Sequence, residues 1–327
     1  MSASTHRKPF VVARQSGPGV DALGGAVVAI GNFDGMHRGH RAVIEAAMRR
    51  ARALDRRAAA LTFEPPPRAF FMPREPLFRL TDERNKLRLL AATGLDGAIV
   101  LDFNAALAAL TANEFIARVL LERFAIAGAA IGFNFHFGKD RGGSPQVLAE
   151  AGKKLGFAVD IVPALEDEGR PVSSGAIRAA LAAGRVVEAA ELLGHPWFVT
   201  GKVIHGEKRG RALGYPTANL ALDPACGLKH GIYAVRVGIG GKRHDGVASF
   251  GRRPTFDDGA PLLEIFLFDF AGDLYGAELD VAFIAWVRHE EKFEAIEDLI
   301  ARMHDDSARA REALKRAGDA FPPLGDV

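Results

Sequence analysis

Over the first 193 residues, short continuous apolar runs alternate with segments in which apolar and polar positions recur at helical spacing. Short apolar runs predict buried parallel strands at 26–30, 58–63, 97–101, 127–132 and 157–162. Between these runs, apolar residues recur at helical spacing, and caps such as Thr111 to Glu114 and Ser144-Pro145 mark where helices begin. Strands that alternate with helices indicate an α/β fold, with a doubly wound, mostly parallel sheet covered by helices on both faces. Ligands of such sheets bind beyond the carboxyl ends of the strands.

The pattern changes near Gly194-His195-Pro196, after a short predicted helix at 185–193. Short strands are predicted at 197–204, 231–237, 245–250, 262–270 and 279–284, separated by glycines and charges with no helices between them. This pattern is typical of a small antiparallel β-barrel. The final segment from Glu290 is predicted to be helical, and one stripe of it is expected to pack on the barrel: Phe293, Ile296, Ile300 and Met303.

These patterns divide the chain into four parts. We expect an N-terminal extension at 1–25, an α/β domain at 26–193, a barrel domain with a C-terminal helix at 195–317, and a frayed tail at 318–327.

Composition narrows the class of protein. A chain of 327 residues fits two domains, and a net charge of +2 gives little support to a nucleic-acid partner. The single cysteine, Cys226, excludes an internal disulfide framework and suits a reducing compartment. The N-terminus lacks the apolar core of a signal peptide, and no apolar run reaches transmembrane length. We therefore expect a cytoplasmic protein with no membrane partner.

The segment from Gly31 to His40 joins the first predicted strand to a helix. Such a turn presents backbone N–H groups and the positive end of a helix dipole, which favours a bound phosphate. Gly35 and Gly39 would let phosphates approach the backbone. His37 and His40 are three residues apart, so they would project from one face and donate hydrogen bonds to oxygens that gain charge at a reacting phosphorus.

Two other interpretations of this histidine pair are weaker. Half of a metal site would need a third ligand, and no cysteine, histidine or carboxylate stands at a suitable spacing. A purely structural pair of caps would not require the flanking glycines. Neither Gly17-Pro18-Gly19, which precedes its strand, nor Gly138-Lys139, which is followed by Asp140, forms a known nucleotide-binding glycine motif.

Two further segments follow predicted strands at the same edge. Residues 132–143 combine aromatic rings, the Asn134 amide and cations with flexible glycines. Ser173 and Ser174 are natural helix caps, and Arg178 lies about one turn into the next helix. Taken alone, this is an ordinary capped helix with a solvated arginine. Together with the histidine turn, it predicts a third element that could hold a polyphosphate.

The second domain contains two candidate sites. In an extended Pro216 to Asn219 segment, Thr217 and Asn219 share a face and could offer two neutral oxygens to Mg²⁺ carrying nucleotide phosphates, although a polar surface turn is the plainer alternative. Glu264 shares an apolar strand face with Phe266. A carboxylate directed into such a face is costly unless paired or functional, so we expect either a general base or an ion pair with Arg252 or Arg253.

The motifs together resemble the prokaryotic bifunctional riboflavin kinase/FMN adenylyltransferase family, also called FAD synthetases. The resemblance extends from about Ala26 to Ala313 and rests on these segments: Gly31–His40, Gly132–Gly138, Ser173-Ser174 with Arg178, Pro216–Asn219, Gly251–Thr255, Glu264 and Leu274–Gly276. It implies an N-terminal nucleotidyltransferase domain with an HxGH motif and a C-terminal riboflavin kinase barrel. It also implies that riboflavin and ATP give FMN, and that FMN and ATP give FAD and pyrophosphate.

The resemblance also implies residue roles. His37 and His40 would stabilise the ATP α-phosphate under attack by FMN, and Ser174 and Arg178 would hold the leaving pyrophosphate. Thr217 and Asn219 would bind Mg-ATP, and Glu264 would accept the proton of the riboflavin 5′-hydroxyl. The other residues expected to contact ATP or flavin are Gly31, Asn32, Phe33, Asp34, Gly35, Gly39, Phe63, Asn134, Ser173, Gly206, Lys208, Gly210, Arg211, Gly214, Pro216, Arg253 and Thr255.

Some positions depart from the family pattern. Gly175 replaces a usual Thr or Ser, which removes one hydroxyl from the predicted pyrophosphate site. Ser249, Phe266 and His289 replace a usual Asn, His and Pro, which we interpret as packing variation. The alternative function is a chain in which one domain is catalytic and the other only binds flavin or nucleotide. An RNA-binding relative of the aminoacyl-tRNA synthetases is disfavoured by the near-neutral charge.

Overall fold

The computed structural model describes residues 9–14, 19–167, 169–206, 214–252 and 261–327. The chain forms two compact units. The first unit comprises Met1–Leu77, Thr81–Ser173 and Pro323–Val327, and the second comprises Phe78–Leu80 and Ser174–Pro322.

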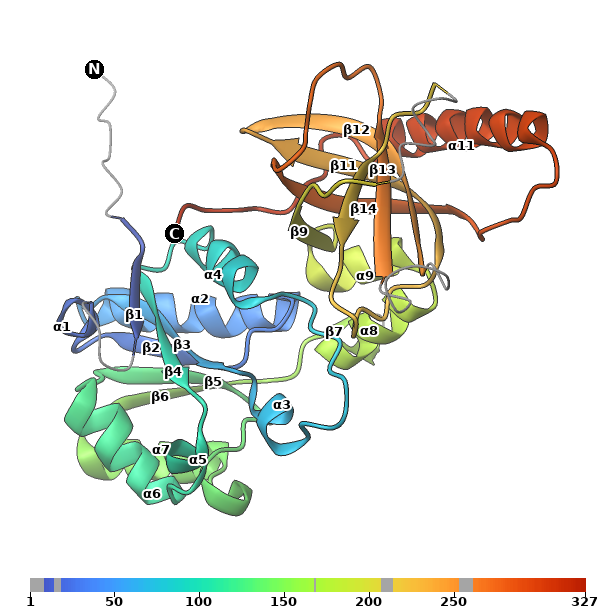
Figure 1. Cartoon of the computed structure of the whole chain (residues 1–327). Coiled ribbons are helices and arrows are strands. Elements are labelled where there is room, and N and C mark those ends of the chain that lie inside the picture. The colour runs from blue at the N-terminus through green and yellow to red at the C-terminus, as the bar shows by residue number, and fades with distance from the viewer. Residues whose placement is uncertain (1–8, 15–18, 168, 207–213, 253–260) are drawn as a thin grey trace, which may run out of the picture. The chain divides into compact units, whose positions relative to one another are not determined.

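A six-stranded parallel sheet forms the centre of the first unit, in the order β1-β4-β3-β2-β5-β6 (Figure 1). Its strands are β1 (Val11–Arg14), β2 (Val27–Ile30), β3 (Ala58–Glu64), β4 (Gly97–Asp102), β5 (Gly128–Gly132) and β6 (Ala158–Val162). The five predicted strands are confirmed. The sixth, β1, lies in the segment that we expected to be an extension, and its residues pair in parallel with β4.

Helices cover both faces of this sheet, as the sequence predicted (Figure 1). One face packs against α2 (Arg38–Ala53) and α4 (Glu83–Ala91). The opposite face packs against the segment formed by α6 (Ala112–Glu114) and η1 (Phe115–Arg123), and against α7 (Pro145–Leu155). The sequence did not predict three short helices: α1 (Val20–Leu23), α3 (Pro67–Phe71) and α5 (Ala105–Ala108).

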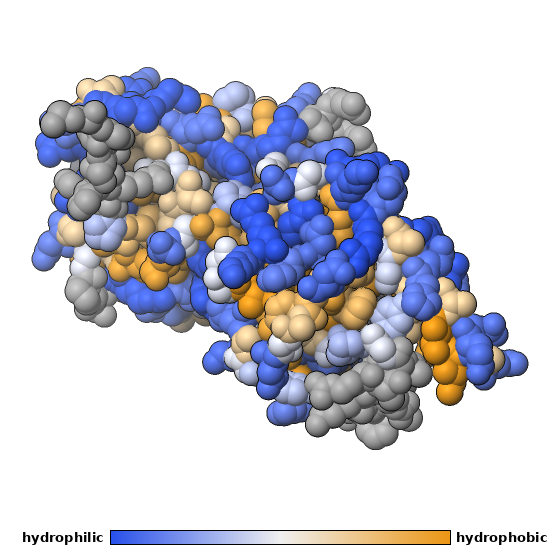
Figure 2. Space-filling view, turned by 90° about the horizontal axis from the view of Figure 1, so that it is seen from above, coloured by the Kyte–Doolittle hydropathy of each residue, from blue (hydrophilic) through white to orange (hydrophobic). Residues whose placement is uncertain are grey.

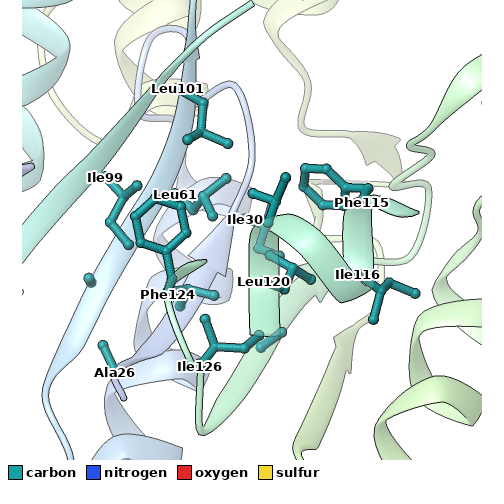
Figure 3. Close-up of a cluster of buried hydrophobic side chains, with 14 of the residues drawn as sticks. Ala26, Ile30, Leu61, Ile99, Leu101, Phe115, Ile116, Leu120, Phe124 and Ile126 are labelled. Atoms are coloured by element: carbon teal, nitrogen blue, oxygen red, sulfur yellow. The ribbon is translucent and has the colours of Figure 1, made fainter. Parts of the chain in front are cut away.

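Local capping explains where the longer helices begin. The Thr111 hydroxyl and the Glu114 carboxylate form the predicted capping box, and the Ser144 side chain accepts a hydrogen bond from the Val147 N–H. Figure 3 shows the core that results, in which sheet residues such as Leu61 and Ile99 meet Leu120 and Phe124. These four side chains are almost completely buried, so they belong to a closely packed core that holds the sheet rigid.

The second unit contains a six-stranded antiparallel sheet in the order β10-β13-β12-β11-β14-β9. Its strands are β9 (Phe198–Lys202), β10 (Ala218–Ala221), β11 (Gly231–Ile239), β12 (Lys242–Arg252), β13 (Pro261–Leu267) and β14 (Glu278–Arg288). A bridge in which the Ile204 N–H donates to the Asn219 carbonyl at 2.9 Å joins the segment after β9 to β10. The sheet therefore curls into a nearly closed barrel, as predicted.

Two helices precede the barrel and belong to the second unit: α8 (Ser174–Ala182) and α9 (Val186–Leu193). They follow the small hairpin of β7 (Glu166–Asp167) and β8 (Arg170–Pro171) in the first unit. From the sequence, we expected both helices to belong to the first domain. The contacts of α9 with β14 explain why they group with the barrel instead.

The C-terminal helix differs from the prediction in its start and in its buried face. It spans α11 (Ile296–Arg316) and not the residues from Glu290, and its buried residues are Asp306, Ala310 and Leu314. Ile296, which was expected to face the barrel, is 59% exposed. The predicted stripe was wrong at Ile296, whereas Ile300 and Met303 are partly buried and Phe293 precedes the helix.

The tail after Ala317 is not frayed, contrary to the prediction. The Arg236 guanidinium donates to the carbonyls of Gly318 and Ala320, and the Arg243 guanidinium lies over the Phe321 ring. Further on, the Gly325 N–H donates to the Arg88 carbonyl at 3.0 Å.

Polar residues predominate on the face seen in Figure 2, with hydrophobic residues in scattered groups between them. Over the described residues, no helix has both the length and the apolar character needed to cross a membrane.

Candidate active sites

The turn after β2 has an unusual backbone. Phe33 and Met36 have positive φ angles of 51° although neither is a glycine, and both side chains are almost completely buried. Gly35 between them has a φ of 82°. Non-glycine residues adopt this conformation only where the surroundings enforce it, and such residues concentrate at functional sites.

His37 and His40 lie together in this turn. His37 is the N-cap of α2, and the His40 N–H donates to its Nδ1 at 3.2 Å. The two rings stack with centroids 3.6 Å apart. Because Nδ1 of His37 accepts a hydrogen bond, the proton of the neutral ring lies on Nε2, which is then a donor.

Both imidazoles are neutral near pH 7. Burial lowers the pKa of His37 to about 4. Burial also holds the pKa of His40 well below its ordinary value, and the charges of His37 and Lys86 lower it further. Nδ1 of His40 is buried without a hydrogen-bond partner among the described residues. Each neutral imidazole keeps one N–H, so two such rings at a helix N-terminus can each donate a hydrogen bond to a phosphate oxygen.

The neighbouring predicted residues hold the turn in place. A Cβ at Gly39 would lie 3.2 Å from two ring atoms of His37, so glycine allows the ring its position. The Asp34 carboxylate accepts the Thr81 N–H at 3.0 Å, and the Thr81 hydroxyl accepts the Gly35 N–H at 3.1 Å. At the start of the turn, the Gly31 N–H donates to β3, and the Asn32 carbonyl accepts from the Thr62 hydroxyl.

A buried lysine that was not predicted from the sequence lies at this edge. Lys86 in α4 is 2% exposed, and its Nζ lies 2.6 Å from Oε1 of Glu64 at the end of β3. The same Nζ donates to the carbonyl of Phe63, a predicted binding residue, at 3.3 Å. A usable signal was present, because Lys86 shares its helix face with the apolar Leu89 and Leu90.

The loop after β5 lies at the carboxyl end of the strand beside β2. Two backbone hydrogen bonds between Phe137 and Gly143, at 3.2 and 2.8 Å, close it. Asn134 is exposed in this loop, and the Phe135 and Phe137 rings stack with centroids 5.4 Å apart. The structure thus brings this loop and the histidine turn to the same edge of the sheet.

The third predicted phosphate element spans the boundary between the two units. Ser173 ends the first unit, whereas Ser174 begins α8 in the second. Arg178 lies one turn into α8, as predicted, and its Nε donates to the Phe78 carbonyl at 2.6 Å.

In the barrel, the predicted residues meet across adjacent strands. Asn219 on β10 is the register partner of Glu264 on β13, and Glu264 is also the partner of Ser249 on β12. Residues paired in this way share a sheet face. Asn219 is 5% exposed, and a Cβ at Gly206 would lie 2.4 Å from its amide nitrogen, so any larger residue there would displace this amide.

The environment of Glu264 differs from the prediction. Leu263, Ile265 and Leu267 form the buried face of β13, whereas Glu264 and Phe266 lie on the alternate, partly exposed face. The carboxylate is therefore not directed into the core. Arg252, a predicted counter-ion, donates from Nη2 to the Pro224 carbonyl at 2.8 Å.

A second carboxylate lies within electrostatic range of Glu264. Burial raises the pKa of Glu290, and the charge of Glu264 raises it further, while His230 and Arg288 oppose the rise. This pairing could not be predicted from local pattern, because Glu290 stands in a run of charged residues.

Some predicted residues lie outside the described ranges: Lys208, Gly210, Arg211, Arg253 and Thr255. Gly214 is described and has a φ of 82°. Within the described part of the chain, no group of three or more His, Cys, Asp or Glu residues could hold a metal ion. A cation in the barrel would therefore be held by few protein ligands together with phosphate oxygens.

Two family models match the chain in succession. Residues 20–176 match the model described as FAD synthetase, and residues 193–314 match the model described as riboflavin kinase. Two curated relatives carry the name bifunctional riboflavin kinase/FMN adenylyltransferase. The one from Escherichia coli strain K12 is 39% identical, and the one from Pseudomonas fluorescens is 41% identical; each alignment covers 88% of this chain and 92% of the relative.

A solved structure has the same fold over nearly the whole chain. It is described as a macrolide-efflux protein from Streptococcus pneumoniae and is 32% identical, with a TM-score of 0.82. The match covers 92% of this chain and 99% of that one.

Proposed function

Since this chain belongs to the family of bifunctional riboflavin kinases/FMN adenylyltransferases, we propose that the two sites described above carry its two reactions. The N-terminal domain adenylylates FMN to FAD with release of pyrophosphate, and the C-terminal domain phosphorylates riboflavin to FMN with ATP. The observation that supports the assignment best is the neutral histidine pair at the N-terminus of α2, because it lies where a polyphosphate would bind.

In adenylyl transfer, a phosphate oxygen of FMN attacks the α-phosphorus of ATP, and the bond to pyrophosphate breaks. Negative charge gathers on the oxygens of the α-phosphate in the transition state. His37, through Nε2–H, and His40 donate hydrogen bonds to these oxygens. Ser174 and Arg178 hold the leaving pyrophosphate, and Phe63 and Asn134 line the nucleotide site.

The domain limits also belong to the proposal. We assign adenylylation to residues 26–193, because the proposed pyrophosphate ligands on α8 precede the barrel in sequence although α8 belongs to the second compact unit. The two family models leave residues 177–192 unassigned.

In the kinase reaction, Glu264 accepts the proton of the riboflavin 5′-hydroxyl as that oxygen attacks the γ-phosphorus of ATP. ADP then leaves. A partly exposed carboxylate suits this role, because the substrate hydroxyl must reach it.

Mg²⁺ is part of the proposal for the kinase site. Thr217 and Asn219 supply oxygen atoms, the ligand type that Mg²⁺ prefers, and Asn219 lies opposite Glu264 on the neighbouring strand. When bound, the cation would neutralise charge on the ATP phosphates. We further propose that the partners are small molecules only, with no nucleic acid or membrane, and that the enzyme is cytoplasmic.

Product analysis tests this assignment. The protein incubated with riboflavin and Mg-ATP is expected to form FMN and then FAD, and Asn219→Ala is expected to prevent the first step while added FMN is still converted. Formation of FAD without any FMN intermediate, or normal FMN formation by Asn219→Ala, would contradict it.

A further inference from the structure

Tyr215 connects three elements of the barrel. It immediately precedes Pro216 and the proposed Mg-ATP segment that leads into β10, and its side chain is 6% exposed. Its ring packs against Phe266 on β13 with centroids 4.7 Å apart. Its hydroxyl lies 2.8 Å from Nδ1 of His304 on α11, in a hydrogen bond.

The helix at the other end of this bond is firmly attached to the barrel. Asp306 lies two residues after His304 and is almost completely buried. It accepts two hydrogen bonds from Arg288 on β14, each at 2.7 Å. The main contacts of α11 are with β11, β12 and β14. Tyr215 precedes β10, which lies at one end of the sheet order, away from β14.

The Tyr215 end of this contact is buried, whereas His304 lies exposed on α11. Burial raises the pKa of the Tyr215 phenol, so the hydroxyl keeps its proton near pH 7. Since an unpaired buried hydroxyl is costly, the pairing restrains the backbone at Tyr215.

Pro216 passes this restraint to the ligand residues. Its ring fixes its own φ and restricts Tyr215 to an extended conformation, so fewer backbone torsions are free between Tyr215 and Thr217. We propose that Tyr215 is a positioning residue for the kinase reaction, and that its bond to His304 holds the Thr217–Asn219 segment in place for Mg-ATP. This inference rests on the proposed role of Thr217 and Asn219.

The test compares steady-state kinetics of matched variants with ATP and riboflavin. Tyr215→Phe keeps the ring contact and removes the hydroxyl, and His304→Leu removes the partner. Each is expected to raise the KM for Mg-ATP about 3- to 10-fold, the equivalent of one modest hydrogen bond, with little change in kcat. The double variant is expected to be no worse than either single one, because both changes break the same bond.

His304→Asn is the conservative rescue. Its amide can reach the position of Nδ1, so the KM is expected to return to within about 2-fold of the parent. This variant and His304→Leu carry the test if circular dichroism shows that Tyr215→Phe does not fold.

Tyr233→Phe is the matched control. The Tyr233 hydroxyl donates to the Lys229 carbonyl, in the same barrel but on β11, so its loss is expected to lower the melting temperature without raising the KM. Conversion of added FMN to FAD is expected to be unchanged in all these variants.

A KM within about 1.5-fold of the parent in both Tyr215→Phe and His304→Leu would overturn the inference. So would an equal rise in Tyr233→Phe, or additive effects in the double variant. Asn219→Ala separates this inference from the proposed function. If Asn219→Ala removes kinase activity and the Tyr215 and His304 variants change nothing, only the inference fails; if Asn219→Ala has no effect, the proposed site itself is wrong.

Discussion

At the scale of single residues, the buried neutral His37 makes the stability of the fold depend on pH. Its pKa is about 4 in the folded chain and 6.5 in the absence of burial. Between these values the unfolded chain binds more protons than the folded chain. The free energy of unfolding is therefore highest above pH 6.5 and decreases as the pH falls toward 4.

His37→Asn removes this titration and keeps a side chain that caps helices well. Urea denaturation at a series of pH values is expected to show a shallower loss of stability between pH 6.5 and 4 in the variant than in the parent. An NMR titration of the parent in which His37 ionises near pH 6.5 would contradict the prediction.

Lys86 gives a second prediction at this scale. Lys86→Met removes the cation and leaves the Glu64 carboxylate, whose side chain is 10% exposed, without its 2.6 Å partner. Breaking a buried pair on one side typically costs about 3–5 kcal/mol, whereas replacing both partners costs far less. In chemical denaturation, the double variant Lys86→Met/Glu64→Gln is therefore expected to have a higher free energy of unfolding than Lys86→Met alone.

The same variants report on the histidine site. Because the Lys86 charge lowers the pKa of His40, this pKa is expected to rise in Lys86→Met. An unchanged His40 pKa in Lys86→Met would show that the lysine charge affects Glu64 at the end of β3 but not His40.

At the scale of elements, the histidine turn depends on Gly39. An alanine there would place its Cβ 3.2 Å from the His37 ring, which must then shift. Adenylylation by Gly39→Ala is expected to fall about 10-fold or more, since small displacements of positioned groups are costly in catalysis. Kinase activity is expected to be unchanged. The control is Gly24→Ala, whose Cβ would meet its nearest atom at 3.4 Å. Equal losses in both variants would mean that the turn acts through stability alone.

The elements also show what a sequence can predict. Caps such as Thr111 with Glu114 depend on residues three apart, so helix starts of this kind follow from local pattern. The start of α11 was missed because the apolar spacing continues upstream of Ile296, and the partners of Lys86 and Glu290 were missed because they lie far away in sequence. The strand face of Glu264 was misjudged because both of its faces carry apolar residues, and burial decides between them only in the fold.

At the scale of the whole molecule, the position of α8 decides where the chain can be cut. Fragment 1–193 contains Ser174 and Arg178, so it is expected to adenylylate FMN, whereas fragment 1–173 is expected not to. Fragment 174–327 keeps α8 and α9 with the barrel and is expected to melt at a higher temperature than 195–327. Both C-terminal fragments are expected to make FMN. Adenylylation by 1–173 would show that α8 holds no pyrophosphate.

The central claim is that two separate sites, the histidine turn and the Glu264 strand, carry the two reactions. It is tested most directly by identifying the flavins formed from riboflavin and Mg-ATP by two variants. Glu264→Gln removes the base, so FMN formation is expected to fall about 10²–10⁴-fold while added FMN still becomes FAD. His40→Ala removes a donor to the reacting phosphate, so FAD formation is expected to fall about 10²–10³-fold while FMN accumulates. Normal FMN formation by Glu264→Gln, or normal FAD formation by His40→Ala, would contradict the account.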